Sequence, residues 1–347
     1  MSDRVADSVA VIVVNRNAGG HLARCLSSLA AQQPLPARIV VFDNGSDDGS
    51  IAAARHVAGQ DDRLAGRTVF HLAEANLGFA AANNRAVALV AAELPGLEFV
   101  AVLNPDAFPE QGWLAALLDA ARRHPEAAAF GSRQVLDASP DLLDGVGDIY
   151  HVSGLSWRAG HGCPPTAADE HDAEIFSPCA AAALYRKDAF DAVGGFDEDF
   201  FCYFEDVDLG FRLRLAGHRA RYVSTAVVRH VGGASARTVG DDFAVFYGHR
   251  NLVWCFFKNM PAPLLAVFLP AHLLQTIFSL MTALPRGRFR AMAAAKWRAV
   301  CGLRTCWQKR QIVQAQRRAS LAAIWRALDK SLFRRRMRPA GGRPSRS

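Results

Sequence analysis

The chain has 347 residues, of which 51% are hydrophobic and 21% charged, proportions that exclude a disordered or fibrous chain and fit a folded protein with a sizeable core. Residues 286–347 contain 18 Lys and Arg against the single acid Asp329, a net charge of +17, whereas residues 1–285 carry 22 bases and 32 acids, a net charge of −10. A basic tail of this kind can bind nucleic acid or an anionic membrane, and composition alone leaves both open.

Strand and helix patterns alternate through the first half of the chain. Apolar, β-branched runs predict strands, and polar loops lead from them into helical patterns. This alternation predicts an α/β fold with a mostly parallel sheet, helices on both faces, and all strand-to-helix loops at the edge where ligands bind. The predicted strands are 9–14, 38–42, 68–72, 99–103 and 127–130, and the predicted helices are about 22–29, 48–58, 80–92 and 110–123.

The second half of the chain begins less regularly. Residues 132–176 are rich in Asp, Gly, Pro and His, and we expect a loop-rich insertion that frames a substrate. Beyond it the pattern predicts an apolar segment over 180–185, a helix to 193, a helix near 206–216 and a strand near 221–228.

Cysteine usage and the N-terminus bear on the compartment. The seven cysteines form no CxxC pair, which disfavours a disulfide framework or a thiolate zinc site, so we expect reduced and mostly structural thiols. The apolar run at 9–14 is too short, and its flank with Asp3 and Asp7 too acidic, for a signal peptide. We therefore expect the body of the protein in the cytoplasm.

An apolar segment lies between Pro261 and Pro285 and is followed by arginines. Its length is just sufficient for the ~20 residues that cross a bilayer core as a helix, but Pro270 interrupts it. Membrane insertion, a helix in the membrane interface, and a buried or dimerising helix all fit this pattern. The arginines suit an anionic cytoplasmic leaflet. We accordingly predict a catalytic domain at 1–257 and an apolar helix with a basic helical tail at 258–347.

Acidic residues occur at three positions where chemistry is plausible. Asp43 fits a turn and helix cap, or an acceptor for the imide N–H of uracil or thymine. Asp106 fits a helix-entry turn, or a ligand of Mg²⁺ or Mn²⁺, which take oxygen donors and substrate phosphates. Residues 204–208 place three acids within four positions, where they repel one another. At a helix N-terminus one of these acids could act as a general base.

Six motifs occur in the order found in family 2 glycosyltransferases. Over about residues 8–255 the chain resembles this family, and most of all its rhamnosyltransferase-like branch, which builds bacterial surface polysaccharides. The resemblance implies a GT-A fold with a Rossmann-like sheet, and an inverting transfer of a sugar such as rhamnose. The motifs are Asp43-Asn-Gly-Ser46, Asn76-Leu-Gly-Phe79 with Asn83-Asn84, Asn104-Pro-Asp106, Gly194-Gly-Phe-Asp197, Phe204-Glu-Asp-Val-Asp208 and His230-Val-Gly-Gly-Ala-Ser235.

The resemblance also implies roles for individual residues. Asp206 matches the catalytic base, and Asp106 and His230 match residues that approach Mg²⁺ or Mn²⁺ and the donor diphosphate. The first position of the family's Asp-x-Asp metal motif is Asn104 here, so one carboxylate is missing. The acceptor site is assigned to Asp197 and Glu205. The donor nucleotide pocket is assigned to Asn15, Asp43, Asn76, Gly78 and Asn83.

The expected partners follow from this resemblance. They are a nucleotide-diphosphate sugar donor and a saccharide or lipid-linked acceptor, met at the cytoplasmic face of the inner membrane. No specific nucleic acid is expected, because the acids at 205–208 would repel a polyanion, although a nucleic-acid-binding protein would explain the basic tail. A nucleotidyltransferase would need a better phosphate loop than residues 15–20 provide. A dinucleotide dehydrogenase would need a G-x-G-x-x-G after the first strand.

Overall fold

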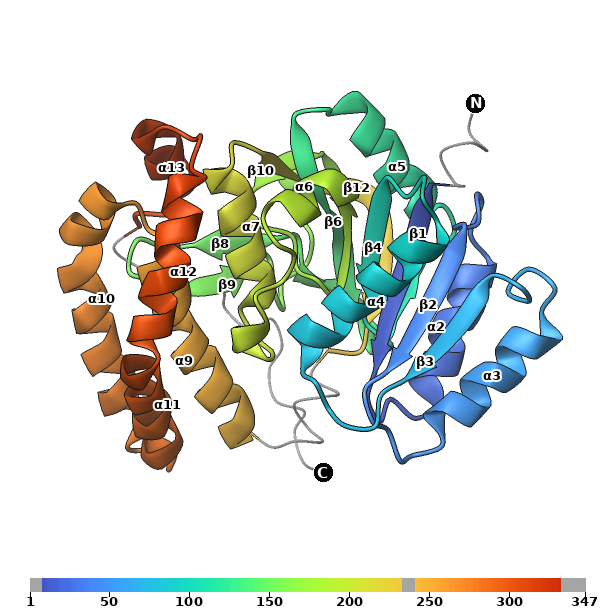
Figure 1. The fold of residues 1–347 in the computed structure, drawn as a ribbon, viewed down its shortest axis with the longest axis horizontal. Coiled ribbons are helices and arrows are strands. Elements are labelled where there is room, and N and C mark those ends of the chain that lie inside the picture. The colour runs from blue at the N-terminus through green and yellow to red at the C-terminus, as the bar shows by residue number, and fades with distance from the viewer. Residues whose placement is uncertain (1–7, 233–240, 332–347) are drawn as a thin grey trace, which may run out of the picture.

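The computed structural model describes residues 8–232 and 241–331. A ten-stranded mixed sheet forms its centre (Figure 1), and a separate pair of strands lies beside it. The strands are β1 (Val9–Asn15), β2 (Arg38–Asp43), β3 (Thr68–Leu72), β4 (Phe99–Leu103), β5 (Ala107–Pro109), β6 (Ala127–Leu136), β7 (Ser139–Gly145), β8 (Asp148–Tyr150), β9 (Ser156–Arg158), β10 (Ala173–Ile175), β11 (Ala182–Arg186) and β12 (Arg219–His230).

The main sheet has the order β10-β12-β6-β11-β4-β1-β2-β3, with β5 beside β12 and β7 beside β6. Strands β4, β1, β2 and β3 pair in parallel, as does β6 with β12. β11 lies between β4 and β6 and is antiparallel to both. The prediction of a mostly parallel α/β sheet is therefore confirmed.

Helices cover both faces of the sheet, and β1 is therefore buried on both sides. The side chains of β1 point alternately to the two faces. Val9, Val11 and Val13 pack with one set of helices, and Ala10 and Ile12 pack with the other. The first set is α2 (Gly20–Ala30), α3 (Ser50–Gln60) and α5 (Trp113–Arg123), and the second is α4 (Phe79–Glu93), α6 (Lys187–Ala192) and α7 (Glu205–Leu215).

The prediction of a loop-rich insertion at 132–176 is wrong. This segment contains the second half of β6, the strands β7 to β10 and a short 3-10 helix, Ala167–Glu170. β6 continues to Leu136 because β12 pairs with it along its length, a contact from far along the chain. The Gly and Asp residues mark turns between short strands, which composition alone does not separate from a long loop.

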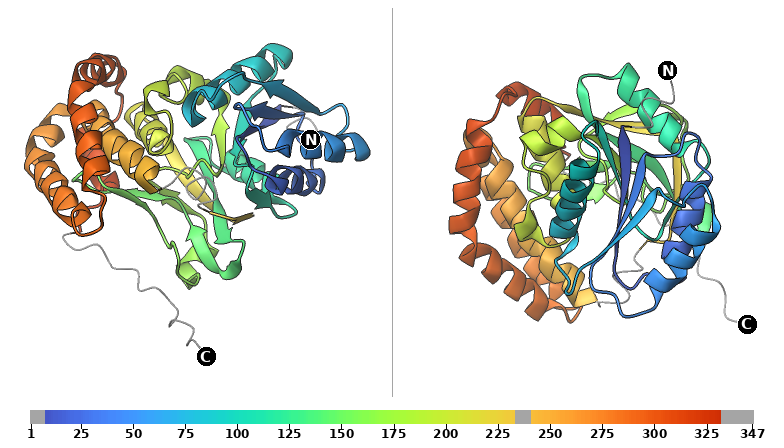
Figure 2. Two further views of the ribbon diagram at one scale, coloured as in Figure 1. Left: turned by 90° about the horizontal axis from the view of Figure 1, so that it is seen from below. Right: turned by 45° about the vertical axis from the view of Figure 1, so that its right-hand side comes forward.

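The C-terminal helices form a layer on one side of the sheet domain (Figure 2). They share a hydrophobic cluster with it, in which Phe256 and Ile324 pack with Tyr150 and Phe211. The proposed boundary between residues 257 and 258 stays a prediction, and α9 runs through it. The helices are α9 (Asp241–Asn259), α10 (Ala262–Ala283), α11 (Phe289–Cys301), α12 (Leu303–Ala315) and α13 (Leu321–Ala327).

Two sequence predictions concern this part of the chain. The apolar segment is a single helix, α10, with Pro270 inside it, and it is long and apolar enough to cross a membrane by length and composition alone. The last basic residues, 332–347, lie outside the described residues, as do positions 233–235 of the sixth motif. All seven cysteines are unpaired, and Cys25, Cys179, Cys255 and Cys306 are buried, which fits structural thiols.

Candidate active site

Two of the predicted acids lie at the same edge of the sheet. Asp43, at the end of β2, pairs in register with Asn15 at the end of β1. On the other side of β1 lies β4, and the turn that contains Asp106 follows the end of β4. Because neighbouring strands are ~4.8 Å apart, Asp43 and this turn are about 10 Å apart across the edge. That separation suits two ends of one extended ligand.

Hydrogen bonds fix the Asp43 carboxylate. Its Oδ1 accepts from Asn15 Nδ2 (2.9 Å) and Ser46 Oγ (2.6 Å), and its Oδ2 accepts from the Ser46 backbone N–H (3.0 Å). Asn15 also donates to Ser50 Oγ at the start of α3 (2.9 Å). Since Asn15 is fully enclosed, it positions Asp43 and cannot itself contact a nucleotide in this structure.

The Asn76 loop joins this edge through Asn44. Asn44 Nδ2 donates to Asn76 Oδ1 (2.9 Å), and Asn44 Oδ1 accepts from the Leu77 N–H (2.8 Å). Gly78 has φ +83°, and a Cβ there would lie 2.5 Å from the Phe201 ring, so only glycine fits. The loop therefore connects the Asp43 region to the segment before α7.

Asn83 is not brought to this edge. It is fully buried in α4, where its Nδ2 donates to the Phe79 carbonyl (2.9 Å). In this structure its side chain supports the first turn of α4 rather than facing a ligand. The sequence motif does not reveal this, because helix register alone does not say which neighbouring element covers a given face.

A buried ionic network surrounds Asp106. His230, at the end of β12, places Nε2 3.4 Å from Asp106 Oδ1 and Nδ1 2.8 Å from Asp144 Oδ2. Burial opposes protonation of the imidazole, but the nearby carboxylates of Asp106 and Asp144 outweigh it and raise the pKa of His230 to about 9. Burial also disfavours the ionised form of Asp106, yet the imidazole of His230 beside it holds the pKa of that carboxyl below its usual value.

The Asp106 and His230 pair fits a divalent cation. Nε2 of His230 is buried without a hydrogen bond and faces a carboxylate oxygen, while Asp144 on Nδ1 orients the ring as carboxylates do behind metal-binding histidines. Binding would require His230 to lose its proton. Among residues 8–232 and 241–331 no cluster of three or more His, Cys, Asp or Glu could hold a metal. The chain would therefore supply two ligands and the substrate the others.

Asp206 lies in the first turn of α7, as predicted, and is linked to the Asp106 turn by a short segment. Its Oδ2 accepts from the Ala180 N–H (3.1 Å). The carbonyl of the following residue, Ala181, accepts from the Asn104 N–H (2.9 Å). Glu205 beside it is buried, and burial followed by the negative charge of Asp206 raises the pKa of Glu205 well above its usual value. Asp206 is only half-buried, so it is the acid of this pair that a substrate can reach.

The turn before α7 is strained and is held from α9. Phe201, Tyr203 and Phe204 have φ of 64°, 65° and 70°, in the left-handed region that side chains rarely adopt. Asn251 Nδ2 donates to the carbonyls of Phe200 (2.8 Å), Cys202 (2.9 Å) and Tyr203 (2.7 Å). No role for Asn251 could be derived from the sequence; in the structure it anchors the turn that leads into Asp206.

Three further residues were missed because they lie in residues 132–176, the segment that the sequence predicted to be loop-rich. Asp144 is buried and pairs with Arg158 as well as His230. Asp148 is buried, and burial followed by the charge of Asp206 raises its pKa well above its usual value. Burial opposes the charge of Arg158, but Cys179 and the acids Asp144, Asp148 and Asp206 raise its pKa. Together they connect the surroundings of Asp106 to those of Asp206.

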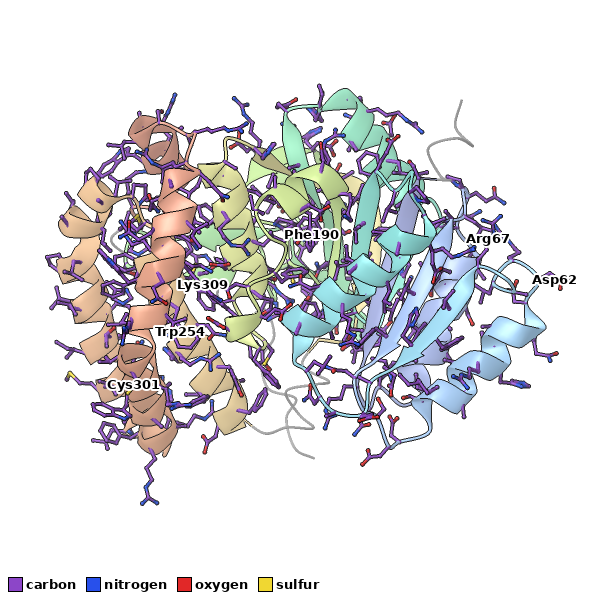
Figure 3. The ribbon with its side chains drawn as sticks, in the orientation of Figure 1. Asp62, Arg67, Phe190, Trp254, Cys301 and Lys309 are labelled. Atoms are coloured by element: carbon purple, nitrogen blue, oxygen red, sulfur yellow. The ribbon has the colours of Figure 1, made fainter. Side chains whose placement is uncertain are left out.

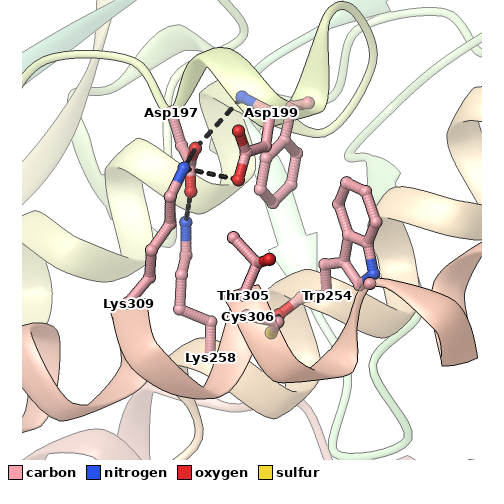
Figure 4. Close-up of a pocket in the computed structure, with 9 residues that line it drawn as sticks. Asp197, Asp199, Trp254, Lys258, Thr305, Cys306 and Lys309 are labelled. Atoms are coloured by element: carbon pink, nitrogen blue, oxygen red, sulfur yellow. Dashed lines mark hydrogen bonds and ion pairs between the residues drawn. The ribbon is translucent and has the colours of Figure 1, made fainter.

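Asp197 lies elsewhere, in an ion-pair cluster between η2 (Glu198–Phe200) and the C-terminal helices (Figure 4). Its carboxylate binds Lys258 and Lys309, and Lys258 also lies 2.8 Å from Asp208. The cluster borders a cavity of about 240 Å³ that Trp254 also lines; Figure 3 places Trp254 and Lys309 where these helices meet α7. Both oxygens of Asp197 are occupied, so the acceptor role assigned to it is not supported by this geometry.

A fixed acid and an Asp–His pair at the carboxyl edge of the sheet, with a helix-start acid linked to them, form a candidate ligand site at the edge where α/β sheets bind their ligands. The chain matches the family described as Glycosyl transferase family 2 over residues 8–194, and it belongs to that family. It is 34% identical over 252 residues to an N-acetylglucosaminyl-diphospho-decaprenol L-rhamnosyltransferase of Mycobacterium tuberculosis, covering 65% of this chain and 76% of the relative. It is 27% identical over 305 residues to the succinoglycan biosynthesis protein ExoA of Rhizobium meliloti, covering 86% of each.

Solved structures share the fold. A mannosyltransferase of Pyrobaculum calidifontis in complex with GDP-Man and Mn²⁺ superposes with a TM-score of 0.52 at 18% identity, covering 92% of this chain and 87% of that one. GalNAc-T7 with UDP, GalNAc and Mn²⁺ superposes with a TM-score of 0.56 at 14% identity, covering 72% and 48%. The expected GT-A-type fold is confirmed.

Proposed function

We propose that this glycosyltransferase moves a sugar from a nucleotide-diphosphate donor to a hydroxyl of a saccharide or lipid-linked saccharide, with inversion at the anomeric carbon. The observation that carries the proposal is the joint anchoring of Asp206 and the Asp106 turn on residues 180–181. This anchoring supports the proposal that the acceptor carboxylate lies near the group that binds the donor diphosphate. Asp43, at the far end of the same edge, is proposed to accept the imide N–H of the base.

In this mechanism Asp206 takes the proton of the acceptor hydroxyl while the oxygen of that hydroxyl attacks the anomeric carbon. The new C–O bond forms on the face opposite the leaving group, the bond to the diphosphate breaks, and the electron pair leaves with the nucleoside diphosphate. General-base help of this kind contributes ~10²- to 10⁴-fold in rate. Mg²⁺ or Mn²⁺ at Asp106 and His230 would supply positive charge to the leaving diphosphate when bound.

The proposed substrates are based on the names of two relatives. The rhamnosyltransferase relative is named for a decaprenyl-linked acceptor, and ExoA for polysaccharide biosynthesis. For this chain we propose rhamnose as the sugar and a lipid-linked saccharide as the acceptor, in bacterial surface polysaccharide synthesis. Such an acceptor places the enzyme in the cytoplasm at the inner face of the membrane.

The test is nucleoside diphosphate release by the full chain. The protein is incubated with UDP-, GDP- and dTDP-linked sugars, including dTDP-rhamnose, with Mg²⁺, Mn²⁺ or a chelator. We expect release with one donor class and its loss with the chelator. Product from a lipid-linked acceptor should have the anomeric configuration opposite to the donor by NMR, and retention would reject the mechanism.

A pair of variants tests the base. Asp206→Asn should lower transfer at least ~10²-fold while donor binding, measured by calorimetry, stays within about twofold. Asp199→Asn is the matched control, an exposed acid that pairs with Lys309 outside the Asp206 network, and should keep transfer near the wild-type rate. Substantial transfer by the Asp206 variant would remove Asp206 from the role of base.

A further inference from the structure

Exposed apolar side chains are concentrated in one part of the molecule. In residues 8–232 and 241–331, every large hydrophobic side chain classed as exposed lies within residues 262–331, apart from Leu72. Six of them, on α10 and at the residue that caps its end, form what we term the α10 face: Val267, Leu274, Ile277, Phe278, Met281 and Leu284, each between 54% and 68% exposed. Their spacing of three, four and seven residues puts them on one stripe of the helix.

The opposite stripe of α10 is packed against the protein. Leu264, His272, Ser279 and Ala283 are buried. His272 Nδ1 contacts the Ser153 carbonyl (2.9 Å), and its ring stacks on Phe256 with centroids 4.1 Å apart. A helix crossing the bilayer with this packing intact would take Ser153 and α9 into the hydrocarbon with it, so the packing favours a helix that stays on the protein and exposes one face.

The charges near this face indicate what covers it. Residues 286–331 contain 12 Lys and Arg and one acid, a net charge of +11, and exposed Arg286 and Arg290 follow α10 directly. A second copy of the chain on this face would bring two such regions together, whereas an anionic lipid surface complements them. Trp325, 41% exposed, stacks on Phe268 of α10 with centroids 5.4 Å apart, and tryptophan prefers the interface between headgroups and acyl chains.

We infer that the α10 face, together with Trp325, docks on an anionic lipid leaflet with the helix lying in the interface plane and not across the bilayer. This inference specifies how the enzyme contacts the membrane, and it rests on the proposed function, which supplies the reason for that contact. The apolar stripe enters the region below the headgroups, and the arginines that follow α10 bind lipid phosphates. Docked in this way, the enzyme holds its active site near acceptors whose lipid is in the same leaflet.

The experiment is co-sedimentation of the full chain with vesicles of phosphatidylcholine alone or with 30% phosphatidylglycerol. We expect binding to the anionic vesicles that weakens as salt rises, and at least tenfold weaker binding to neutral ones. Leu274→Glu/Phe278→Glu should weaken binding to anionic vesicles at least tenfold. Leu72→Glu, which alters an exposed leucine outside the C-terminal helices (58% exposed), is the control and should bind as the wild type does.

Membranes carrying the protein are then washed with alkaline carbonate, which should release an interfacial helix and retain a spanning one. Retention would overturn the inference, and so would vesicle binding that the double variant keeps. A dimer in solution that the double variant splits would assign the face to a second copy. Nucleoside diphosphate release is measured in parallel: vesicle binding without release rejects the proposed transfer alone, and release without vesicle binding rejects the docking alone.

Discussion

Lys258 offers a quantitative test of how the C-terminal helices are attached. Its side chain is 2% exposed and sits between the carboxylates of Asp197 and Asp208, whose side chains are 7% and 0% exposed. Lys258→Met keeps most of the apolar stem but removes the charge. Removing one partner of a buried ion pair costs about 3–5 kcal/mol, because the remaining charge is left uncompensated.

The structure places the expected loss at the low end of that range. Asp208 keeps Arg212 (2.7 Å) and Asn259 (2.7 Å), and Asp197 keeps Lys309. We therefore expect Lys258→Met to lower the free energy of unfolding by about 3 kcal/mol. Lys309→Met is the matched variant: this lysine is 36% exposed and Asp197 retains Lys258, so the loss should stay below about 1 kcal/mol.

The assay is urea unfolding of the full chain and both variants, followed by tryptophan fluorescence and far-UV circular dichroism. Trp254 borders the same cavity, so its emission should report on this region. The two lysine variants could lose the same free energy of unfolding, or Lys258→Met could lose none. Either result would refute the reasoning that Lys258 is needed to compensate the buried charges of Asp197 and Asp208.

Three further predictions use other groups. Asp144→Asn should weaken Mn²⁺ binding ~10- to 100-fold, measured by electron paramagnetic resonance of free Mn²⁺, because Asp144 orients His230. Asn251→Ala should cost about 1–3 kcal/mol in thermal unfolding, because it leaves buried carbonyls without a donor, and should also reduce transfer. Burial opposes ionisation of Asp197, but Lys258 and Lys309 outweigh it and hold its pKa well below the usual value. Its contribution to stability is therefore present above pH ~4 and lost as pH falls below that, and the acid limb should be shallower in Lys258→Met.

Each of these has an outcome that contradicts it. The control is Asp137→Asn, which removes a carboxylate that pairs with Arg24 at the surface and should leave Mn²⁺ affinity unchanged. Unchanged affinity in Asp144→Asn as well would mean that Asp144 does not orient His230 for the metal. Full stability of Asn251→Ala would mean that water replaces its amide. An acid limb as steep in Lys258→Met as in the wild type would place the acid sensitivity in other carboxylates.

The predictable part of this fold is the part specified by local pattern. β1, β2 and β4 are apolar β-branched runs buried on both faces, and their lengths and loops identify them without tertiary information. β11 could be located as an apolar segment, but its antiparallel insertion between β4 and β6 depends on pairing across about 80 and 50 residues. Contacts of that separation leave no trace in local composition.

The site shows the same division. Asp43, Asp106 and Asp206 could be proposed because each follows a strand or opens a helix. Asp144 and Arg158 could not, because Asp144 meets His230, and Arg158 meets Asp144, only once the chain has folded. Asn83 and Asp197 were assigned to substrate from the family resemblance, yet Asn83 is fully buried in α4 and the Asp197 carboxylate is paired with two lysines.

The anchoring of the 201–204 turn sets a minimum size for an active chain. The family match ends at residue 194, before Asp206, and the amide that secures the 201–204 turn comes from Asn251. Lys258 and Asn259 contact Asp208, which lies with Asp206 in the first turn of α7. Trimming the protein to the portion that the family match covers would discard the proposed base together with its supports. The C-terminal helices thus support the segment that carries the proposed base, in addition to the membrane docking proposed for them.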